Sequence, residues 1–183
     1  MPKIPRLDRT RASVLVVDVQ EKLIPVMWNW APVEKYLKAL IQTAKELDLP
    51  LIATEQYPKG LGATIPVLRE MLPASPLVKM HFSCGADPEF TKALAATGRR
   101  QVIVAGIETH VCVFQTVREL AARGVEVFVP VDGVASRRDD HRAAGLDLCR
   151  TAGATLTTME TVVFDWLRRA GTDPFKQLSK LIR

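Results

Sequence analysis

The chain has 183 residues, of which 48% are hydrophobic and 25% are charged, and this composition fits one folded globular domain over residues 1–183. The 25 Lys and Arg residues outnumber the 20 Asp and Glu residues by a scattered surplus of five, which disfavours a nucleic-acid-binding surface. No apolar run reaches the roughly 18 residues that a membrane-spanning helix requires, so the sequence excludes a membrane span.

The N-terminal segment and the cysteines favour the cytoplasm. Residues 1–13 are basic and lead directly into an apolar run, without the hydrophobic core or the cleavage site of a secretion signal. The cysteines Cys84, Cys112 and Cys149 are odd in number and have no C-x-x-C spacing, which is typical of reduced thiols. We therefore expect a cytoplasmic protein with free thiols.

Short apolar runs alternate with longer amphipathic stretches along the chain. Most of the short runs are apolar throughout, as in strands of a parallel sheet that is covered on both faces. Strands are predicted at residues 13–19, 50–54, 76–79, 101–106, 125–132 and 154–158. Helices are predicted at residues 32–47, 88–97, 112–123, 139–152, 160–170 and 174–182. The alternation predicts a three-layer α/β/α sandwich with a six-stranded, mostly parallel, Rossmann-like sheet. The last helix has an apolar stripe, which we expect to pack against the same chain or a partner subunit.

Three reactive side chains lie at the carboxyl ends of predicted strands, where α/β sheets bind their ligands. Asp18 ends the first strand, Lys79 ends the third, and Cys112 follows the fourth at the start of a predicted helix. Backbone N–H groups and the dipole at a helix start favour a thiolate, which makes Cys112 a candidate nucleophile. The strand order 3-2-1-4 would bring Asp18 close to Cys112, with Lys79 reaching across, and would make Asp18 a candidate base.

Each of these residues also has a structural interpretation. Cysteine is often buried as a small apolar residue, and we interpret Cys84 and Cys149 in this way. Taken alone, Asp18 could cap a helix or pair with Lys22, and Lys79 could be solvated. Only the three residues together favour catalysis.

The sequence gives little support for a metal or a cofactor. His81 and Cys84, with His110 and Cys112, would supply four metal ligands, but their spacing matches no standard zinc module. Gly106 lacks the further glycines of a phosphate-binding loop. We therefore expect no metal and no cofactor.

Three segments of this chain, taken together, resemble one known family. The isochorismatase-like cysteine hydrolases have segments similar, in the same order, to VLVVDVQEKL around Asp18, LVKMHFSC around Lys79 and VIVAGIETHVCVFQTV around Cys112. The resemblance covers residues 13–167. The segments ETHVCV and TEQYPKGLG are most similar to those of the isochorismatase domain-containing branch. The resemblance implies the α/β/α fold, a small-molecule substrate and a homo-oligomer.

The resemblance also implies a mechanism. Asp18 is the general base, Lys79 holds the charge network, and Cys112 attacks a carbonyl carbon to form a thioester acyl-enzyme. The implied substrate is a small amide or imide, cleaved at its C–N bond. A cis peptide bond between Ile107 and Glu108 is implied too, with the backbone N–H groups of Glu108 and Cys112 forming an oxyanion hole.

Candidate pocket residues and one departure from the family complete the expectations. Gln20, Tyr57, Phe82 and His110 lie near the strand ends and are candidates for the substrate pocket. Nicotinamidases of this superfamily carry an Asp-x-His metal motif after the second strand, where this chain has Glu-Gln-Tyr-Pro at residues 55–58. The resemblance therefore implies no nicotinamidase-type metal site.

Two other functions stay open. The chain is a vinyl-ether hydrolase of the isochorismatase type if Asp18 acts as a general acid, or a non-catalytic oligomeric interaction module that retains the triad. Isochorismatases proper lack the nucleophilic cysteine, so Cys112 favours amide chemistry.

Overall fold

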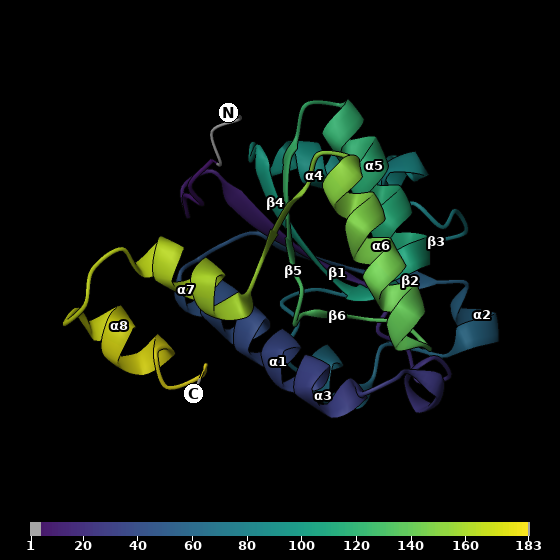
Figure 1. Cartoon of the computed structure of the whole chain (residues 1–183), viewed down its shortest axis with the longest axis horizontal. Coiled ribbons are helices and arrows are strands. Elements are labelled where there is room, and N and C mark those ends of the chain that lie inside the picture. Colours follow the sequence, from purple (N-terminus) through teal and green to yellow (C-terminus); the bar gives the residue numbers. More distant parts are fainter. Residues whose placement is uncertain (1–4, 183) are drawn as a thin grey trace.

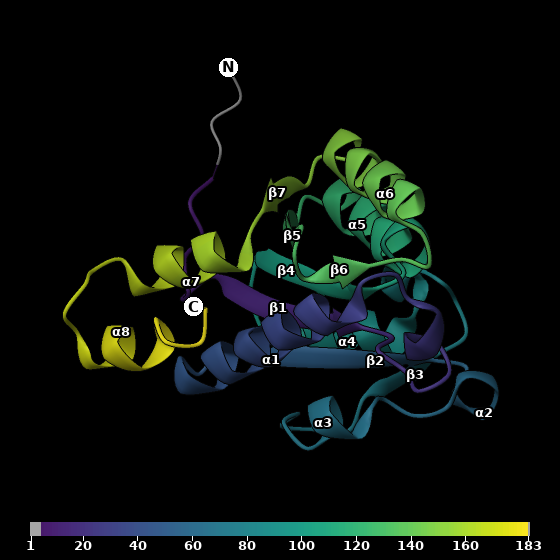
Figure 2. The same cartoon turned by 60° about the horizontal axis from the view of Figure 1, so that its bottom comes forward.

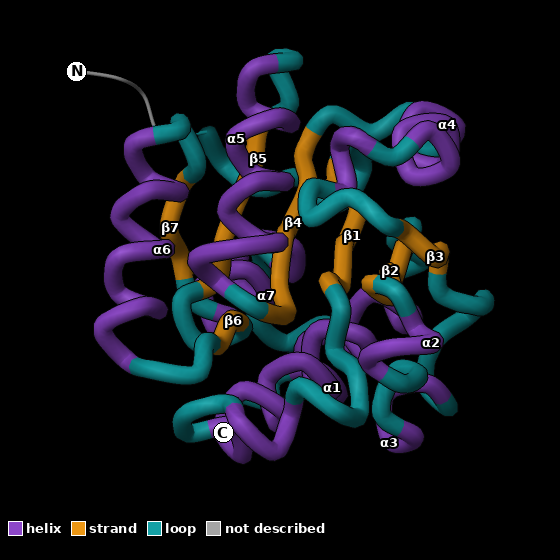
Figure 3. The backbone as a smooth tube through the Cα atoms, turned by 90° about the vertical axis from the view of Figure 1, so that its right-hand side faces the viewer, coloured by secondary structure: helices purple, strands orange, loops and turns teal. Residues whose placement is uncertain are grey.

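Unbroken apolar runs form the strands of one parallel sheet in the computed structural model, which describes residues 5–182. The strands are β1 (Ala12–Val17), β2 (Leu51–Gln56), β3 (Leu77–Lys79), β4 (Gln101–Ile107), β5 (Glu126–Pro130), β6 (Val134–Ala135) and β7 (Thr155–Thr157). They lie in the order β3-β2-β1-β4-β5-β7, and β6 pairs with the end of β4 (Figure 3). This arrangement confirms the α/β fold, and it contains the order 3-2-1-4 that makes the first and fourth strands neighbours.

The predicted number of strands is one too low. Each of the six predicted strands is present, but β6 is a seventh strand, which pairs with Gly106 and Ile107 of β4. β6 is only two residues long, and the sequence predicts no strand between those at 125–132 and 154–158. A two-residue strand has too few side chains to show a periodic pattern, so its sequence cannot be distinguished from that of a loop.

Helices cover both faces of the sheet (Figures 1 and 2). One face carries α1 (Trp30–Glu46) and α7 (Met159–Leu167), and the other carries α4 (Pro88–Ala96), α5 (Phe114–Ala122) and α6 (Asp139–Thr151). The shorter helical elements are η1 (Ile24–Val26), α2 (Pro58–Leu61), α3 (Pro66–Arg69), η2 (Cys84–Ala86) and α8 (Asp173–Leu178). The sandwich therefore has the three predicted layers.

Alternate residues along each strand face opposite helix layers, because successive side chains of a strand point to opposite faces. On β1, Val14 and Val16 pack in the core beneath α1 and α7, whereas Leu15 and Val17 pack in the core beneath α4, α5 and α6. A slip of one residue would exchange these two sets, so the two cores fix the register of the sheet. The register in turn fixes which side chains reach the carboxyl edge.

The C-terminal helix α8 packs on the same chain. Leu178 is buried in the core beneath α1 and α7, and the ring of Phe175 lies 6.2 Å from the ring of Phe164 on α7. Of the two predicted partners for this segment, the structure shows the chain's own body. Among the helices of residues 5–182, none combines the length and the apolar character needed to cross a membrane.

Candidate active site

Asp18 is placed by the close approach of two central strands. It follows β1 directly and has a left-handed backbone conformation, with φ 51°. Beside it on β4, Gly106 has φ 115°, and a Cβ atom there would lie 2.2 Å from the carbonyl oxygen of Val17. Only glycine permits this approach. The Asp18 side chain therefore starts from a backbone position that the pairing of β1 with β4 defines.

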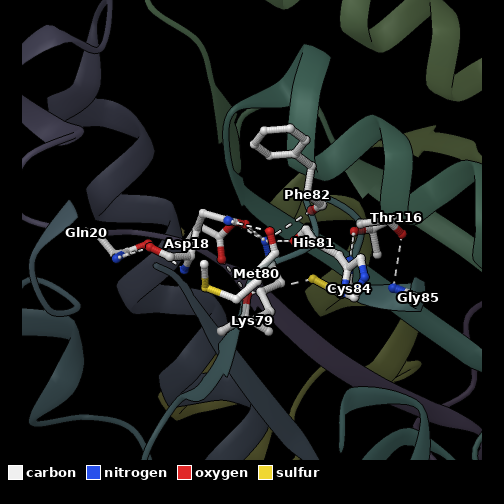
Figure 4. Close-up of polar contacts among 12 residues, drawn as sticks. Asp18, Gln20, Lys79, Met80, His81, Phe82, Cys84, Gly85 and Thr116 are labelled. Atoms are coloured by element: carbon white, nitrogen blue, oxygen red, sulfur yellow. Dashed lines mark hydrogen bonds and ion pairs between the residues drawn. The ribbon is translucent and has the colours of Figure 1, made fainter. Parts of the chain in front are cut away.

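Lys79 holds the Asp18 carboxylate from β3 (Figure 4). Its Nζ donates to Asp18 Oδ2 at 2.6 Å and to Gln56 Oε1 at 2.8 Å. It also donates to the carbonyl oxygens of Phe82 at 3.0 Å and His81 at 3.2 Å. Asp18 and Lys79 are each only 1% exposed, so this is a buried ion pair with the ammonium group fully engaged.

Thr54 on β2 holds the other oxygen of the same carboxylate. Its Oγ1 donates to Asp18 Oδ1 at 2.7 Å and lies 3.7 Å from the Sγ atom of Cys84. Thr54 is not among the site residues that the sequence predicts. The available signal was a hydroxyl residue at the end of an apolar strand, next to the strand that ends in Asp18.

Cys112 lies in a π-helical turn, η3 (Thr109–Val113), that joins β4 to α5. Its side chain is 7% exposed, and burial and the nearby Asp18 carboxylate both raise the pKa of its thiol. The structure therefore places Cys112 at the carboxyl edge of the sheet, within electrostatic range of the ion pair between Asp18 and Lys79.

The surroundings of Cys112 differ from the helix start that the sequence predicts. The helical backbone begins at Thr109, so Cys112 does not start the helix as predicted. Burial raises the pKa of the Cys112 thiol well above its ordinary value, and the charge of Asp18 raises it further, while Lys79 opposes both. The resting group is a thiol that faces a carboxylate.

The turn that carries Cys112 is anchored on two sides. Thr109 Oγ1 donates to the carbonyl oxygen of Ala135 on β6 at 2.9 Å. On α6, a Cβ atom at Gly145 would lie 2.7 Å from the backbone nitrogen of His110, so the helix presses directly on the turn. These contacts explain why a turn this irregular has a defined position.

Glu108 directly precedes the turn, and its side chain pairs with Arg137. The peptide bond between Ile107 and Glu108 is cis, as the family resemblance implies. The Glu108 carboxylate accepts hydrogen bonds from Arg137 Nε at 3.2 Å and Nη2 at 3.1 Å. Its carbonyl oxygen accepts from the N–H groups of Val111 and Val113. The Glu108 side chain is therefore committed to Arg137.

The Gln20 side chain bonds to the backbone of neighbouring segments and does not line a pocket. It is fully buried, and its Nε2 donates to the carbonyl oxygens of Gln56 at 2.9 Å and Gly62 at 2.7 Å. Its Oε1 accepts from the Gln56 N–H at 2.8 Å. This corrects the placement of Gln20 among the pocket candidates, because its amide is used to tie β2 to the following loop.

The other three pocket candidates have accessible surface. The rings of Tyr57 and Phe82 are about half exposed, and Figure 4 shows the Phe82 ring pointing away from Asp18 and Lys79. His110 is partly buried, with Nδ1 3.0 Å from Ser136 Oγ. Burial lowers the pKa of His110, which favours a neutral ring. Phe82 contributes its carbonyl oxygen, rather than its ring, to the position of Lys79.

The four ligands of the alternative metal site do not come together. Over residues 5–182, no group of three or more His, Cys, Asp or Glu side chains is arranged to hold a metal ion. Cys84 instead lies beside Thr54, and His110 beside Ser136.

Comparisons with known proteins agree on one family. The family model of the isochorismatase domain matches residues 12–161. Isochorismatase domain-containing protein 2 of Danio rerio is 35% identical over 183 residues, which cover 100% of this chain and 92% of that protein. The MAR1 ribonuclease structure from Caenorhabditis elegans has 37% identity and a TM-score of 0.90, covering 97% of this chain and 92% of that one. The YcaC gene product from Escherichia coli, described as an octameric hydrolase of unknown specificity, has 30% identity and a TM-score of 0.92, covering 100% of this chain and 91% of that one.

Proposed function

This chain belongs to the isochorismatase family of hydrolases, and we propose that it cleaves C–N bonds of small amides or imides through a cysteine thioester. One observation carries the proposal: the buried Asp18 carboxylate forms an ion pair with the Lys79 ammonium group, and its charge adds to the effect of burial in raising the pKa of the Cys112 thiol. A thiol beside a carboxylate that can accept its proton is the arrangement that nucleophilic catalysis requires.

In the first half of the reaction, Cys112 attacks the substrate. Because the resting group is a thiol, Asp18 accepts its proton as the sulfur bonds to the carbonyl carbon. The carbonyl oxygen becomes an oxyanion, to which the N–H groups of Glu108 and Cys112 donate, each contributing about 2.7–4 kcal/mol. The C–N bond then breaks, and the leaving nitrogen takes the proton from Asp18. A thioester on Cys112 and a free amine or ammonia result.

In the second half, water removes the acyl group. Asp18, now a carboxylate again, accepts a proton from a water molecule as the water oxygen bonds to the thioester carbon. The C–S bond breaks, the sulfur regains its proton, and the product leaves as a carboxylic acid. Lys79 stays charged throughout and compensates the negative charge that moves between Asp18 and Cys112. The accessible side chains of Tyr57, Phe82 and His110 are the proposed contacts of the substrate.

A substrate panel tests the proposal. Small primary amides and cyclic imides are incubated with the protein, and ammonia release, ring opening and the intact mass of acid-quenched protein are measured. We expect turnover of at least one compound, with an acyl adduct on the peptide that contains Cys112. A vinyl ether and an RNA are included, and cleavage of either without an adduct on Cys112 would contradict the cysteine mechanism. An activated ester, p-nitrophenyl acetate, serves as a probe that needs no knowledge of the substrate, and failure to acylate Cys112 would favour a non-catalytic module.

Alkylation by iodoacetamide tests the pairing of Cys112 with Asp18 without any substrate. Asp18 raises the pKa of the Cys112 thiol through its charge and its hydrogen bond, so Asp18→Asn lowers that pKa and increases the thiolate fraction near neutral pH. We expect alkylation of Cys112 to become about 3- to 10-fold faster in the variant. The measurement is the rate of mass increase on each cysteine peptide.

Cys149 is the internal control of the alkylation experiment. Burial alone raises its pKa to about 12, so its slow alkylation is expected to be the same in both proteins, and faster alkylation of Cys149 would reveal unfolding. An unchanged rate at Cys112 in Asp18→Asn, with Cys149 still slow, would contradict the contact between base and nucleophile.

We also propose that the protein is a homo-oligomer, as the octameric YcaC relative is. β3 lies at one edge of the sheet, and Val78 on it, with Met80 and Phe82 in the segment that follows, have more than half of their surface exposed; we call these three residues the apolar stripe. Exposed apolar residues at the edge of a sheet are a surface that a second copy of the chain can cover.

Light scattering after size-exclusion chromatography measures the assembly. We expect a mass above that of one chain for the wild type, and a smaller mass for Val78→Lys because it places a charge within the stripe. Val67→Lys, at an exposed position on α3 outside the stripe, is the matched control and should leave the mass unchanged. A monomeric wild type would refute self-association, and an unchanged mass in Val78→Lys would refute this surface.

A further inference from the structure

Both oxygens of the Asp18 carboxylate accept hydrogen bonds from side chains on two different strands. Lys79 on β3 reaches Oδ2 at 2.6 Å, and Thr54 on β2 reaches Oδ1 at 2.7 Å. The three side chains are each 1% exposed. The function proposed above uses Lys79 for its charge, and it assigns no part to Thr54.

A single contact at Oδ2 would leave the carboxyl group free to pivot. The lysine ammonium is a point charge on a flexible stem, so it attracts the carboxylate without fixing the plane of the carboxyl group. A second bond at Oδ1 removes that rotation. Because the charge of this carboxylate acts on the nearby Cys112 thiol, the orientation of the carboxyl plane decides whether the thiol proton has an acceptor in line.

We propose that Thr54 is a positioning residue for the reaction: its hydroxyl holds the Asp18 carboxylate in the orientation that accepts the proton of Cys112, and the buried Cys84 thiol holds that hydroxyl. This inference rests on the proposed function, since it matters only if Asp18 accepts that proton.

The direction of the hydrogen bonds follows from proton counting. The Thr54 hydroxyl has one proton and donates it to Asp18 Oδ1, so in its 3.7 Å contact with Cys84 the thiol is the donor. Burial raises the pKa of Cys84 to about 11, which keeps that proton in place. The backbone N–H of Cys84 donates to Thr116 Oγ1 at 2.9 Å, which fixes Cys84 in turn (Figure 4). The chain of contacts therefore runs from α5 through Cys84 and Thr54 to Asp18.

Substitution of Thr54 tests the proposal with p-nitrophenyl acetate as the probe. Thr54→Val keeps the shape of the side chain and removes the hydroxyl. We expect the rate constant for acylation of Cys112 to fall about 10- to 100-fold, as a misplaced catalytic group would cause. The half-saturating ester concentration should stay within about twofold of the wild type, and Thr54→Ser should recover the rate to within about threefold, because it restores the donor.

Thr43 supplies the matched control. It is fully buried in α1, and its hydroxyl has no hydrogen-bond partner among the described residues. Thr43→Val therefore makes the same chemical change without touching Asp18, and the acylation rate should equal that of the wild type. Urea unfolding of each variant measures whether stability differs.

The outcomes separate this inference from the proposed function. Wild-type acylation in Thr54→Val, or slow acylation that Thr54→Ser does not recover, overturns the positioning role while the cysteine mechanism stands. Acylation that survives in Cys112→Ala overturns the cysteine mechanism itself. If Thr54→Val does not fold, Thr54→Ala is compared with Thr54→Ser, and equal acylation rates in that pair overturn the proposal.

Discussion

Cys112→Ala is expected to abolish the initial burst of p-nitrophenolate that acylation by p-nitrophenyl acetate releases. It is also expected to lower the turnover of any amide identified in the substrate panel by about 10⁴-fold or more. The reason is chemical: without the sulfur there is no nucleophile in contact with Asp18 and no atom to carry the acyl group. The loss should occur without unfolding, since replacing one small buried side chain changes the free energy of unfolding by about 1 kcal/mol. The measurements are burst amplitude, steady-state rate and urea unfolding on the same samples.

Cys149→Ala is the matched control for this experiment. Cys149 is also buried, but it lies on α6, and burial alone perturbs its pKa. The control variant should therefore keep the full burst amplitude and lose only a little stability. A burst that survives in Cys112→Ala, or one that disappears equally in Cys149→Ala, would show that the loss is not specific to the nucleophile.

Lys79→Met is expected to lower the free energy of unfolding by about 3–5 kcal/mol, a large fraction of the stability of a domain of this size. Lys79 and Asp18 are each 1% exposed, so the substitution leaves a buried carboxylate without its counter-charge. It also removes the donor that Gln56 Oε1 and the carbonyl oxygens of His81 and Phe82 share. Urea unfolding at neutral pH measures the change.

A double variant separates the charge effect from the loss of packing. In Asp18→Asn with Lys79→Met, no unpaired charge remains in the site, so the double variant should be more stable than Lys79→Met alone. The coupling free energy from the four proteins gives the strength of the ion pair. A double variant that is less stable than Lys79→Met alone would contradict the buried ion pair as the cause.

Most of the fold follows from the pattern of apolar runs. The strands that are covered on both faces, such as β1 and β4, are continuous apolar segments, and the helices between them have one apolar stripe, so both are visible in the sequence. The elements that were missed are short: β6 has two residues, and the turn η3 separates Cys112 from the helix that it was expected to start. Such elements are formed by tertiary contacts, including the one between Gly145 and His110, which local sequence patterns do not contain.

The candidate site was only partly visible in the sequence. The positions of Asp18 and Lys79 at strand ends follow from topology, because parallel strands bring their carboxyl ends to one edge. The directions of side chains do not follow from it: Gln20 lies near the same edge but turns into the backbone, and Thr54 turns onto Asp18. The pKa of Cys112 was also misjudged, since the effect of burial depends on atoms that sequence spacing cannot place.

During synthesis the strands leave the ribosome in the order β1, β2, β3 and only then β4. The Asp18 carboxylate and the Lys79 ammonium group can therefore form their ion pair before Cys112 has been synthesised. β4 pairs with β1 only afterwards, and Cys112 follows β4 in the chain. A nascent or truncated polypeptide that ends before β4 has the base but not the nucleophile, so the thiol joins the site only in a chain in which β4 has paired with β1.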